Sequence, residues 1–227
     1  MSAEVVAPAT GGVFAAALDA ASRCAIDAGA AALRRGGIVV YPTETVYGLG
    51  VDARSGEALS RLLGLKGRDG GRGMSVLVGD LAMASRLLAA EPPAGALALA
   101  RHFWPGPLTL VLPAAADVAP QLRGAGGGIG LRCSSDPWAR ALVEAFAAPV
   151  TSTSANPSGA EPARSASQAR ACFASGVDVF VDGGVRSGSA VSSVVEFLQG
   201  RAYLRRVGAI DAAAIAAVTD LTEESLG

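Results

Sequence analysis

The chain has 227 residues, of which 51% are hydrophobic and 17% are charged, and its formal net charge is −1. This composition excludes disorder along the whole chain, leaves ample apolar residues for a core, and argues against a globally basic nucleic-acid binder. The three cysteines lie far apart without a CxxC pair, which indicates neither a disulfide framework nor a cysteine zinc site and favours a reducing cytoplasm.

No membrane segment is predicted, because no apolar run approaches the roughly 18 residues that a transmembrane helix needs. Residues 1–12 do not have the pattern of a signal peptide, and we interpret them as a flexible N-terminus. No internal repeat and no Pro/Ser-rich linker divides the chain, so one domain is expected.

Hydrophobic periodicity, capping residues and turn residues predict the secondary structure. Helices are predicted over 18–35, 55–65, 80–90, 93–103, 138–147 and 165–174, with a small helix in the tail at 209–227. Strands are predicted over 38–41, 75–78, 108–112, 129–132, 150–154, 177–181, 194–197 and 201–206.

The strand over 38–41 is continuously apolar, which is typical of a strand buried on both faces. The helix before it should end at Gly36–Gly37, and Ser55 should cap the next helix. The hydroxyl-bearing segment Thr43–Thr45 follows the strand directly, and this is where open α/β sheets place ligand groups. Residues 47–50 then continue as glycine-rich backbone.

The segment around Lys66 is a candidate phosphate-binding loop. Lys66 is the only lysine of the chain, and Arg68 and Arg72 follow it among glycines. Lysine offers a point charge on a flexible stem whereas arginine offers a rigid fork, so a lone lysine indicates a need for an ammonium group here. Three cations on glycine-rich backbone suit a loop over a polyanion, and an ordinary solvated loop is the alternative. The pattern is not that of a P-loop, because glycine follows the lysine.

Hydroxyl, amide and guanidinium groups recur at the ends of other predicted strands. They are Thr109, Arg132, Ser152, Ser154, Asn156, Ser192 and Arg206. Such groups give directional hydrogen bonds and bidentate binding of carboxylate or phosphate, so they predict a site for a polyanionic nucleotide beside a small carboxylate. Arg132 is the strongest candidate outside the loop, because a buried guanidinium needs a partner. The single histidine, His102, is interpreted as structural, which argues against a Ser-His-Asp or Cys-His hydrolase.

Seven motifs follow one another along the chain: YPTETVYGLG (41–50), LKGR (65–68), WPGPLTLVLP (104–113), GLRCSSDP (130–137), TSTSANPSG (151–159), VSSVVEF (191–197) and LRRVGAI (204–210). This ordered series resembles that of the YrdC-like threonylcarbamoyl-AMP synthases. The set is far more specific than any one of its motifs, because it spans most of the chain in the family order.

The resemblance implies a fold and an activity. The fold would be α/β with mixed α+β character: a single domain over 13–210, with a twisted sheet of parallel and antiparallel strands and flanking helices, and a C-terminal tail over 211–227. This is the short, single-domain form of the family. The activity would be that of a nucleotidyltransferase, an L-threonylcarbamoyladenylate synthase that forms threonylcarbamoyl-AMP and pyrophosphate from L-threonine, bicarbonate and ATP.

The resemblance also implies partners. The product would serve tRNA t6A37 biosynthesis through a downstream t6A transferase complex, with direct tRNA binding at most weak. Mg²⁺ would accompany ATP, held through the ATP phosphates and not by the protein.

Residue by residue, the resemblance assigns Thr43, Thr45, Arg132, Ser154 and Ser192 to threonine binding. It assigns Lys66, Arg68, Asn156 and Arg206 to ATP binding, with Arg72 as an addition and with Lys66 and Arg68 as the catalytic pair.

Three positions depart from the family pattern. Asp69 stands where proline is common, Gly79 stands where histidine is common, and an RPG sequence is replaced by Arg206-Val207-Gly208. Two alternatives therefore stay open, an RNA-binding module of the same fold and a paralogue without this activity. A carbamoyl-adenylate domain of the hydrogenase-maturation kind is less well supported, because the zinc-finger and acylphosphatase segments of such proteins are not found in this sequence.

Overall fold

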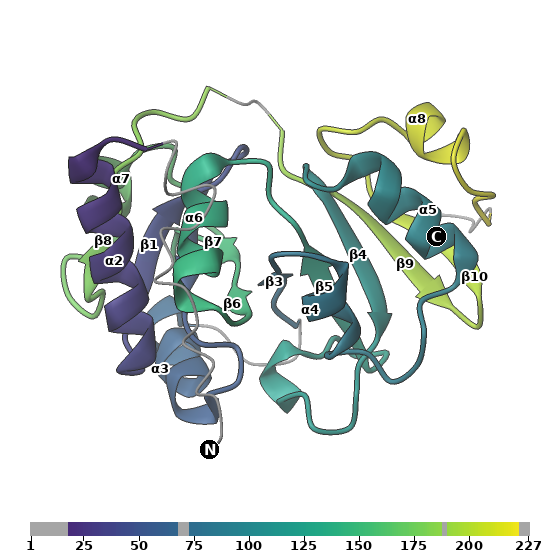
Figure 1. The fold of residues 1–227 in the computed structure, drawn as a ribbon, viewed down its shortest axis with the longest axis horizontal. Helices are drawn as coiled ribbons and strands as arrows, with labels where there is room; N and C mark the ends of the chain where they lie inside the picture. The colour runs from purple at the N-terminus through teal and green to yellow at the C-terminus, as the bar shows by residue number, and fades with distance from the viewer. Residues whose placement is uncertain (1–17, 68–72, 188–189, 223–227) are drawn as a thin grey trace, which may run out of the picture.

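A computed structural model describes residues 18–67, 73–187 and 190–222, in which helices pack around two β-sheets (Figure 1). The helices are α2 (Ala20–Arg34), α3 (Gly56–Lys66), α4 (Leu81–Ser85), α5 (Ala94–Phe103), α6 (Pro137–Phe146), α7 (Ala166–Cys172), α8 (Ala212–Ala216) and the short 3-10 helix η2 (Pro120–Leu122). The strands are β1 (Val39–Pro42), β2 (Tyr47–Gly50), β3 (Val76–Leu77), β4 (Leu108–Pro113), β5 (Gly128–Arg132), β6 (Val150–Thr151), β7 (Thr153–Ser154), β8 (Val179–Phe180), β9 (Ser193–Leu198) and β10 (Arg201–Arg206). The predicted mixed α/β class is confirmed, because each sheet contains both parallel and antiparallel pairs.

The strands divide between two sheets instead of forming the single twisted sheet that the sequence predicts. One sheet has the order β7-β2-β1-β8, and the other has the order β10-β9-β4-β5-β3-β6. The strand predicted over 150–154 is broken at Ser152, so that β6 pairs with β3 while β7 pairs with β2. An antiparallel bridge between Asp52, which follows β2, and Val150 of β6 also links the two sheets.

Strand β1 is buried on both faces, as predicted. Val39 and Tyr41 belong to a core formed with α2 and α6, while Val40 belongs to a larger core that includes side chains of α3 and α7. Because side chains alternate along a strand, one continuous apolar run serves two cores. The strand therefore holds the residues that follow it, from Thr43 onward, in a fixed place between helical layers.

Strand β2 is the element that the sequence interpretation missed, because its glycines disfavour a strand. It runs antiparallel to β1, with Tyr41 opposite Gly48. A Cβ atom at Gly50 would lie 2.7 Å from the Tyr41 ring, which is closer than real Cβ atoms approach other atoms. The glycines thus let the Tyr41 ring lie across β2 and bring its hydroxyl within 2.8 Å of the Thr151 carbonyl oxygen, to which it donates.

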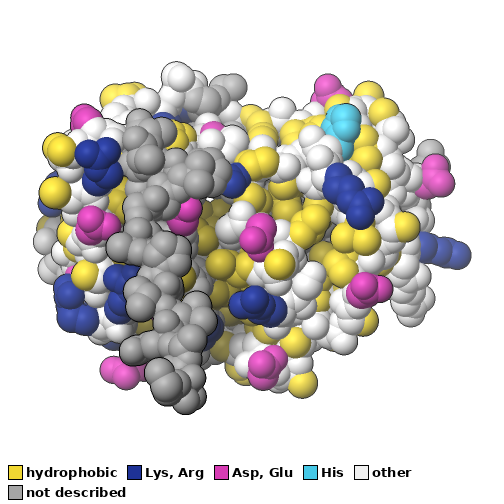
Figure 2. Space-filling view, in the orientation of Figure 1, with side chains coloured by type: hydrophobic (Ala, Val, Ile, Leu, Met, Phe, Trp, Pro, Cys, Tyr) yellow, Lys and Arg dark blue, Asp and Glu magenta, His cyan; other side chains and the backbone are white. Residues whose placement is uncertain are grey.

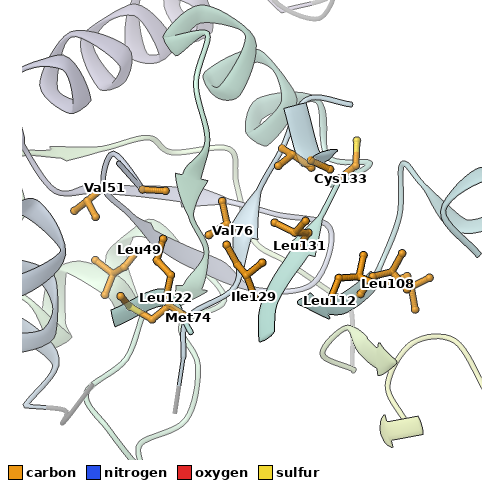
Figure 3. Close-up of a cluster of buried hydrophobic side chains, with 14 of the residues drawn as sticks. Leu49, Val51, Met74, Val76, Leu108, Leu112, Leu122, Ile129, Leu131 and Cys133 are labelled. Carbon is orange, nitrogen blue, oxygen red and sulfur yellow. The ribbon is translucent and has the colours of Figure 1, made fainter. Parts of the chain in front are cut away.

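The larger core draws on strands of both sheets. Figure 3 shows part of it, with Leu49, Val51, Met74, Val76, Leu108, Leu112, Leu122, Ile129, Leu131 and Cys133 labelled. On β5, Ile129 and Leu131 point into this core, so the alternation of a strand turns Gly130 and Arg132 to the opposite face. That opposite face is the one on which the candidate site lies.

Predicted helix starts are confirmed where a capping residue marks them. The Ser55 hydroxyl accepts a hydrogen bond from the backbone N–H of Ala58, and Asp136 caps α6 in the same way. Helix α4 is shorter than predicted, because residues after it pair with the chain at the C-terminal end of β4: Leu88 bridges Ala114, and the Ala89 N–H donates to the Pro113 carbonyl.

Residues 211–222 pack onto the domain. Ile215 of α8 is fully buried in the larger core, and Leu221 forms a bridge with Ala202 of β10. The domain boundary at 210 stays a prediction, and the N-terminus at 1–12 lies outside the described residues. Among the helices of the described residues, none has the length and apolarity needed to cross a membrane.

Candidate active site

A cavity of about 490 Å³ opens between the two sheets. Strand alternation places its walls: Thr109 and Val111 of β4, Arg132 of β5 and Val194 of β9 face it, while the residues between them enter the larger core. The other lining side chains that matter for chemistry are Thr43, Thr45, Ser152, Ser154, Ser192 and Arg206. Among the described residues that line the cavity, two are cationic and none is acidic, a histidine or a cysteine.

The first wall is the turn that follows β1. The Thr43 hydroxyl donates to the Val46 carbonyl at 2.7 Å and accepts longer bonds, of 3.3 Å each, from the backbone N–H groups of Thr45 and Val46. Its oxygen also lies 3.0 Å from the Thr45 hydroxyl oxygen. Both threonines are almost fully buried, so the two hydroxyls are fixed in place at the edge of the cavity.

Arg132 lies against this wall and forms an ion pair with Glu44. Its Nη2 atom lies 2.9 Å from Oε1 of Glu44 and 3.3 Å from the Thr45 hydroxyl oxygen. The prediction that a buried guanidinium has a partner is therefore confirmed, and the partner is a residue that the sequence interpretation did not assign to the site. The available signal was the position of Glu44 between the two assigned threonines.

Glu44 is itself held from the turn between β5 and α6. The Ser134 hydroxyl donates to Oε2, and the Ser135 backbone N–H donates to Oε1 at 3.3 Å. Burial alone would raise the pKa of Glu44, but the Arg132 charge and the Ser134 hydrogen bond outweigh it and lower the pKa below its usual value. Glu44 is therefore a carboxylate near neutral pH.

The second wall consists of Thr109, Ser192 and Arg206, which form one hydrogen-bonded cluster. The hydroxyl oxygens of Thr109 and Ser192 are 2.9 Å apart. Arg206 donates from Nε to the Ser192 carbonyl at 2.9 Å and from Nη2 to the Ser192 hydroxyl at 3.1 Å. The resemblance assigns Ser192 to threonine and Arg206 to ATP, whereas the structure joins the two residues by hydrogen bonds.

Arg206 is placed by the backbone around it. The buried Ser193 hydroxyl accepts from the N–H groups of Gly208 and Ile210, at 2.9 and 3.0 Å, and donates to the Ile210 carbonyl. Burial lowers the pKa of Arg206, and the positive charge of Arg132 lowers it further. Two like charges therefore face the same cavity, an arrangement that favours an anion between them.

Lys66 and Asn156 lie beside the cavity and are not among the residues that line it. Lys66 is buried at the end of α3, and its Nζ donates to the carbonyl of Ser154, which does line the cavity. Asn156 donates to the Pro157 and Ala160 carbonyls, while its Oδ1 is buried without a hydrogen-bond partner in the described part of the chain. Arg68, Arg72 and Asp69 lie outside the described residues.

The remaining departures from the family pattern differ in their structural setting. A Cβ atom at Gly79 would lie 3.7 Å from its nearest neighbours, side-chain atoms of Met83 and Val143, so the position has room for a side chain. A Cβ atom at Gly208 would lie 2.6 Å from the Ser193 backbone nitrogen, so only glycine fits there. His102 is exposed on α5, packs edge-on against Phe103 and is not among the residues that line the cavity.

The described residues contain no group of three or more His, Cys, Asp or Glu side chains that could hold a metal ion. The cavity lining offers hydroxyl groups and cations, which suit the oxygens of an anion better than they suit a cation. Chemically, the described lining can bind and orient an anionic ligand by charge and directional hydrogen bonds.

Comparison with known proteins gives the family. The sequence model of the family described as "Telomere recombination", named for Sua5, YciO and YrdC, matches residues 31–208. A threonylcarbamoyl-AMP synthase of Halorhodospira halophila is 40% identical over 177 residues, which cover 78% of this chain and 92% of that protein.

Two solved structures have the same fold. P. abyssi Sua5 complexed with L-threonine has a TM-score of 0.81 at 32% identity, covering 86% of this chain and 57% of that chain. E. coli YciO has a TM-score of 0.75 at 26% identity, covering 86% of this chain and 93% of that chain. The chain therefore spans little more than half of the P. abyssi protein, but most of the other two proteins. On these matches, the chain belongs to the Sua5/YciO/YrdC family.

Proposed function

We propose that this chain is an L-threonylcarbamoyladenylate synthase, a nucleotidyltransferase that converts L-threonine, bicarbonate and ATP into threonylcarbamoyl-AMP and pyrophosphate. The observation that carries the proposal is the pair of cationic, hydroxyl-bearing walls facing one cavity, each built around an arginine. Two anionic ligands, a small carboxylate and a triphosphate, match two such walls. The similarity to proteins named threonylcarbamoyl-AMP synthase and to a Sua5 bound to L-threonine supports the same assignment.

The first chemical step needs little from the protein beyond proximity. The threonine amine attacks the carbon of bicarbonate, a C–N bond forms, and water leaves to give the carbamate. Arg132 is assigned to the threonine carboxylate, with Thr43, Thr45 and Ser154 as hydrogen-bonding neighbours. This assignment uses a guanidinium that is already oriented by Glu44.

In the second step a carbamate oxygen attacks the α-phosphorus of ATP in line, and the bond from that phosphorus to the pyrophosphate oxygen breaks. Negative charge grows on the leaving phosphates, so fixed cations supply most of the stabilisation. Lys66, Arg68 and Arg206 are assigned to this charge, with Asn156 and Arg72 at the nucleotide. Mg²⁺ enters as part of the substrate MgATP, held by phosphate oxygens.

The direct test is mass spectrometry of the adenylate formed by the purified chain from ATP, bicarbonate and isotopically labelled threonine. We expect a product that carries the threonine label and one bicarbonate carbon, with one pyrophosphate released per adenylate. The absence of threonine-dependent product and pyrophosphate would contradict the proposal and favour an RNA-binding module of the same fold. Direct tRNA binding and a downstream t6A transferase complex stay predictions from the resemblance, and a cytoplasmic location stays a prediction from the cysteine pattern.

A further inference from the structure

Arg132 is held at one of its nitrogens and is unpaired at another. Nη2 contacts Glu44 at 2.9 Å and Thr45 at 3.3 Å. Nε of the same guanidinium is buried and has no hydrogen-bond partner in the described part of the chain. A buried charged donor without an acceptor is costly to the folded state, so this nitrogen favours an anion that comes close enough to accept from it.

The orientation of Arg132 is set by a chain of contacts that begins at α6. Asp136 caps that helix by accepting from the N–H groups of Trp138 and Ala139, and its own N–H donates to the Ser134 hydroxyl at 3.2 Å. The Ser134 hydroxyl in turn donates to Glu44. Both oxygens of the Glu44 carboxylate thus accept hydrogen bonds from the turn between β5 and α6, and Oε1 also pairs with the Arg132 guanidinium.

We propose that Glu44 is a positioning residue that holds the Arg132 guanidinium in the orientation from which it binds the carboxylate of the amino-acid substrate. This inference rests on the proposed function. Arg132 lines the cavity and Glu44 does not, so Glu44 acts through the arginine and does not touch the ligand. Its lowered pKa makes it a poor proton acceptor near neutral pH, which agrees with positioning and not with general-base catalysis.

The role predicts a selective defect. Glu44→Gln keeps the shape of the side chain and one acceptor oxygen but removes the negative charge, so Arg132 is held less firmly. Ser192 is hydrogen-bonded to Arg206 and to Thr109, and none of these contacts involves Glu44. Threonine binding should therefore weaken while ATP binding is preserved.

The first measurement compares KM for threonine and for ATP in the wild type, Glu44→Gln and Glu196→Gln. Glu196 is the matched control, because it pairs with Arg205 at 2.7 Å and its side chain is 18% exposed against 17% for Glu44. Glu44→Gln should raise KM for threonine about tenfold or more and change KM for ATP less than about threefold. Equal effects on both KM values, or an unchanged KM for threonine, would overturn the proposal.

The second measurement follows Arg132 itself in protein labelled with ¹⁵N-arginine, and its Nε–H resonance is assigned by its loss in Arg132→Lys. We expect slow exchange of this proton with water in the wild type and in Glu196→Gln, and fast exchange in Glu44→Gln. Slow exchange in Glu44→Gln would overturn the positioning role. Ser134→Ala removes the hydroxyl that donates to Glu44 and should also speed exchange of the Arg132 Nε proton, to a smaller degree. This variant replaces Glu44→Gln in the experiment if Glu44→Gln does not fold.

This resonance needs no turnover, so the two proposals can fail separately. A wild type that forms no adenylate but loses protection of the Arg132 proton in Glu44→Gln would contradict the proposed function alone. A wild type that forms the adenylate while Glu44→Gln keeps both its KM for threonine and its protected proton would contradict the positioning role alone.

Discussion

Buried cations define the site at the scale of single residues. Lys66 is 5% exposed and Arg132 is 6% exposed, and each is held by an oxygen, the Ser154 carbonyl and the Glu44 carboxylate respectively. Burying a charge is unfavourable unless hydrogen bonds and opposite charges replace the lost water. Glu44 supplies an opposite charge to Arg132, and the Ser154 carbonyl supplies a dipole to Lys66.

Lys66→Ala should slow adenylate formation roughly ten- to a hundredfold, because losing one charge-assisted contact costs about 1.5–3 kcal/mol. The rate of threonylcarbamoyl-AMP formation at saturating threonine and ATP measures this effect. Arg61→Ala is the control on the same helix; it removes a hydrogen bond to the Gly36 carbonyl. We expect the control to stay within about twofold of the wild type. A wild-type rate for Lys66→Ala would remove this lysine from the catalytic assignment.

At this scale the sequence predicts which residues gather but not how they are paired. Hydroxyls and arginines at strand ends were identifiable, because strand ends meet at one edge of a sheet. The pairing of Arg132 with Glu44 could not be read from the sequence, since Arg132 ends β5 of one sheet and Glu44 lies in the turn after β1 of the other. The link between Ser192 and Arg206 likewise depends on the register of β9 against β10. The catalytic and binding roles of all assigned residues stay predictions.

At the scale of elements, the hairpin of β9 and β10 carries Arg206 to the cavity. The residues that follow β10 are held against Ser193 of β9. This serine is fully buried, and its hydroxyl accepts hydrogen bonds from the backbone N–H groups of Gly208 and Ile210. The polypeptide after β10 lies so close to β9 that Gly208 has no room for a side chain. The position of the Arg206 guanidinium therefore depends on one glycine and one hydroxyl.

Gly208→Ala should destabilise the fold by about 1–3 kcal/mol, because its Cβ would overlap backbone atoms that cannot move aside easily. Gly64→Ala is the matched control, since Gly64 lies inside α3 with no atom within 4 Å of its Cβ position. That change should stabilise the protein by about 0.5–1 kcal/mol through helix propensity. Thermal unfolding followed by circular dichroism measures both, and a lower melting temperature for both variants or for neither would contradict the packing argument.

Elements with clear end signals were predictable, and elements shaped by tertiary contacts were not. Helices α3 and α6 begin at capping residues that the sequence displays, Ser55 and Asp136. Strand β2 was missed because its glycines serve the packing of Tyr41, a contact that no local pattern reveals. Helix α4 ends early for the same kind of reason, since the chain after it pairs with residues near the end of β4.

At the scale of the whole molecule, charges of both signs are distributed over the face that Figure 2 shows. On the face shown in Figure 2, basic and acidic side chains of the described residues are interspersed among polar and apolar ones. This fits the near-neutral net charge of −1. Two cationic side chains of the described residues, the buried Arg132 and the more exposed Arg206, face the cavity between the two sheets.

The ion pair of Glu44 with Arg132 makes stability depend on pH. The pKa of Glu44 is lowered below its usual value of 4.5, so Glu44 stabilises the folded state above pH 4.5 and this contribution is lost as the pH falls further. The difference in unfolding free energy between wild type and Glu44→Gln should therefore be about 2 kcal/mol near pH 7 and should shrink at about pH 3.5. Urea unfolding at the two pH values measures it, and an equal difference at both would contradict the argument.

Asp136 provides the opposite case. Burial raises its pKa, although the Arg186 charge and the helix-cap hydrogen bonds lower it in part. Its contribution to stability is therefore present at low pH and declines as the pH rises through its raised pKa. The destabilisation caused by Asp136→Asn should accordingly shrink from acid to neutral pH, a trend opposite to that of Glu44→Gln in the same titration.

Ser152 joins the two sheets, because it is the one residue between β6 and β7. Its backbone N–H donates to the Ser75 carbonyl at 2.7 Å, next to β3. Side chains alternate along a strand, so one inserted residue would exchange the faces of Thr153 and Ser154 or shift them out of register with β2. The chain is thus held to a fixed length at this point, and insertions that arise during evolution can be accommodated in surface loops but not here.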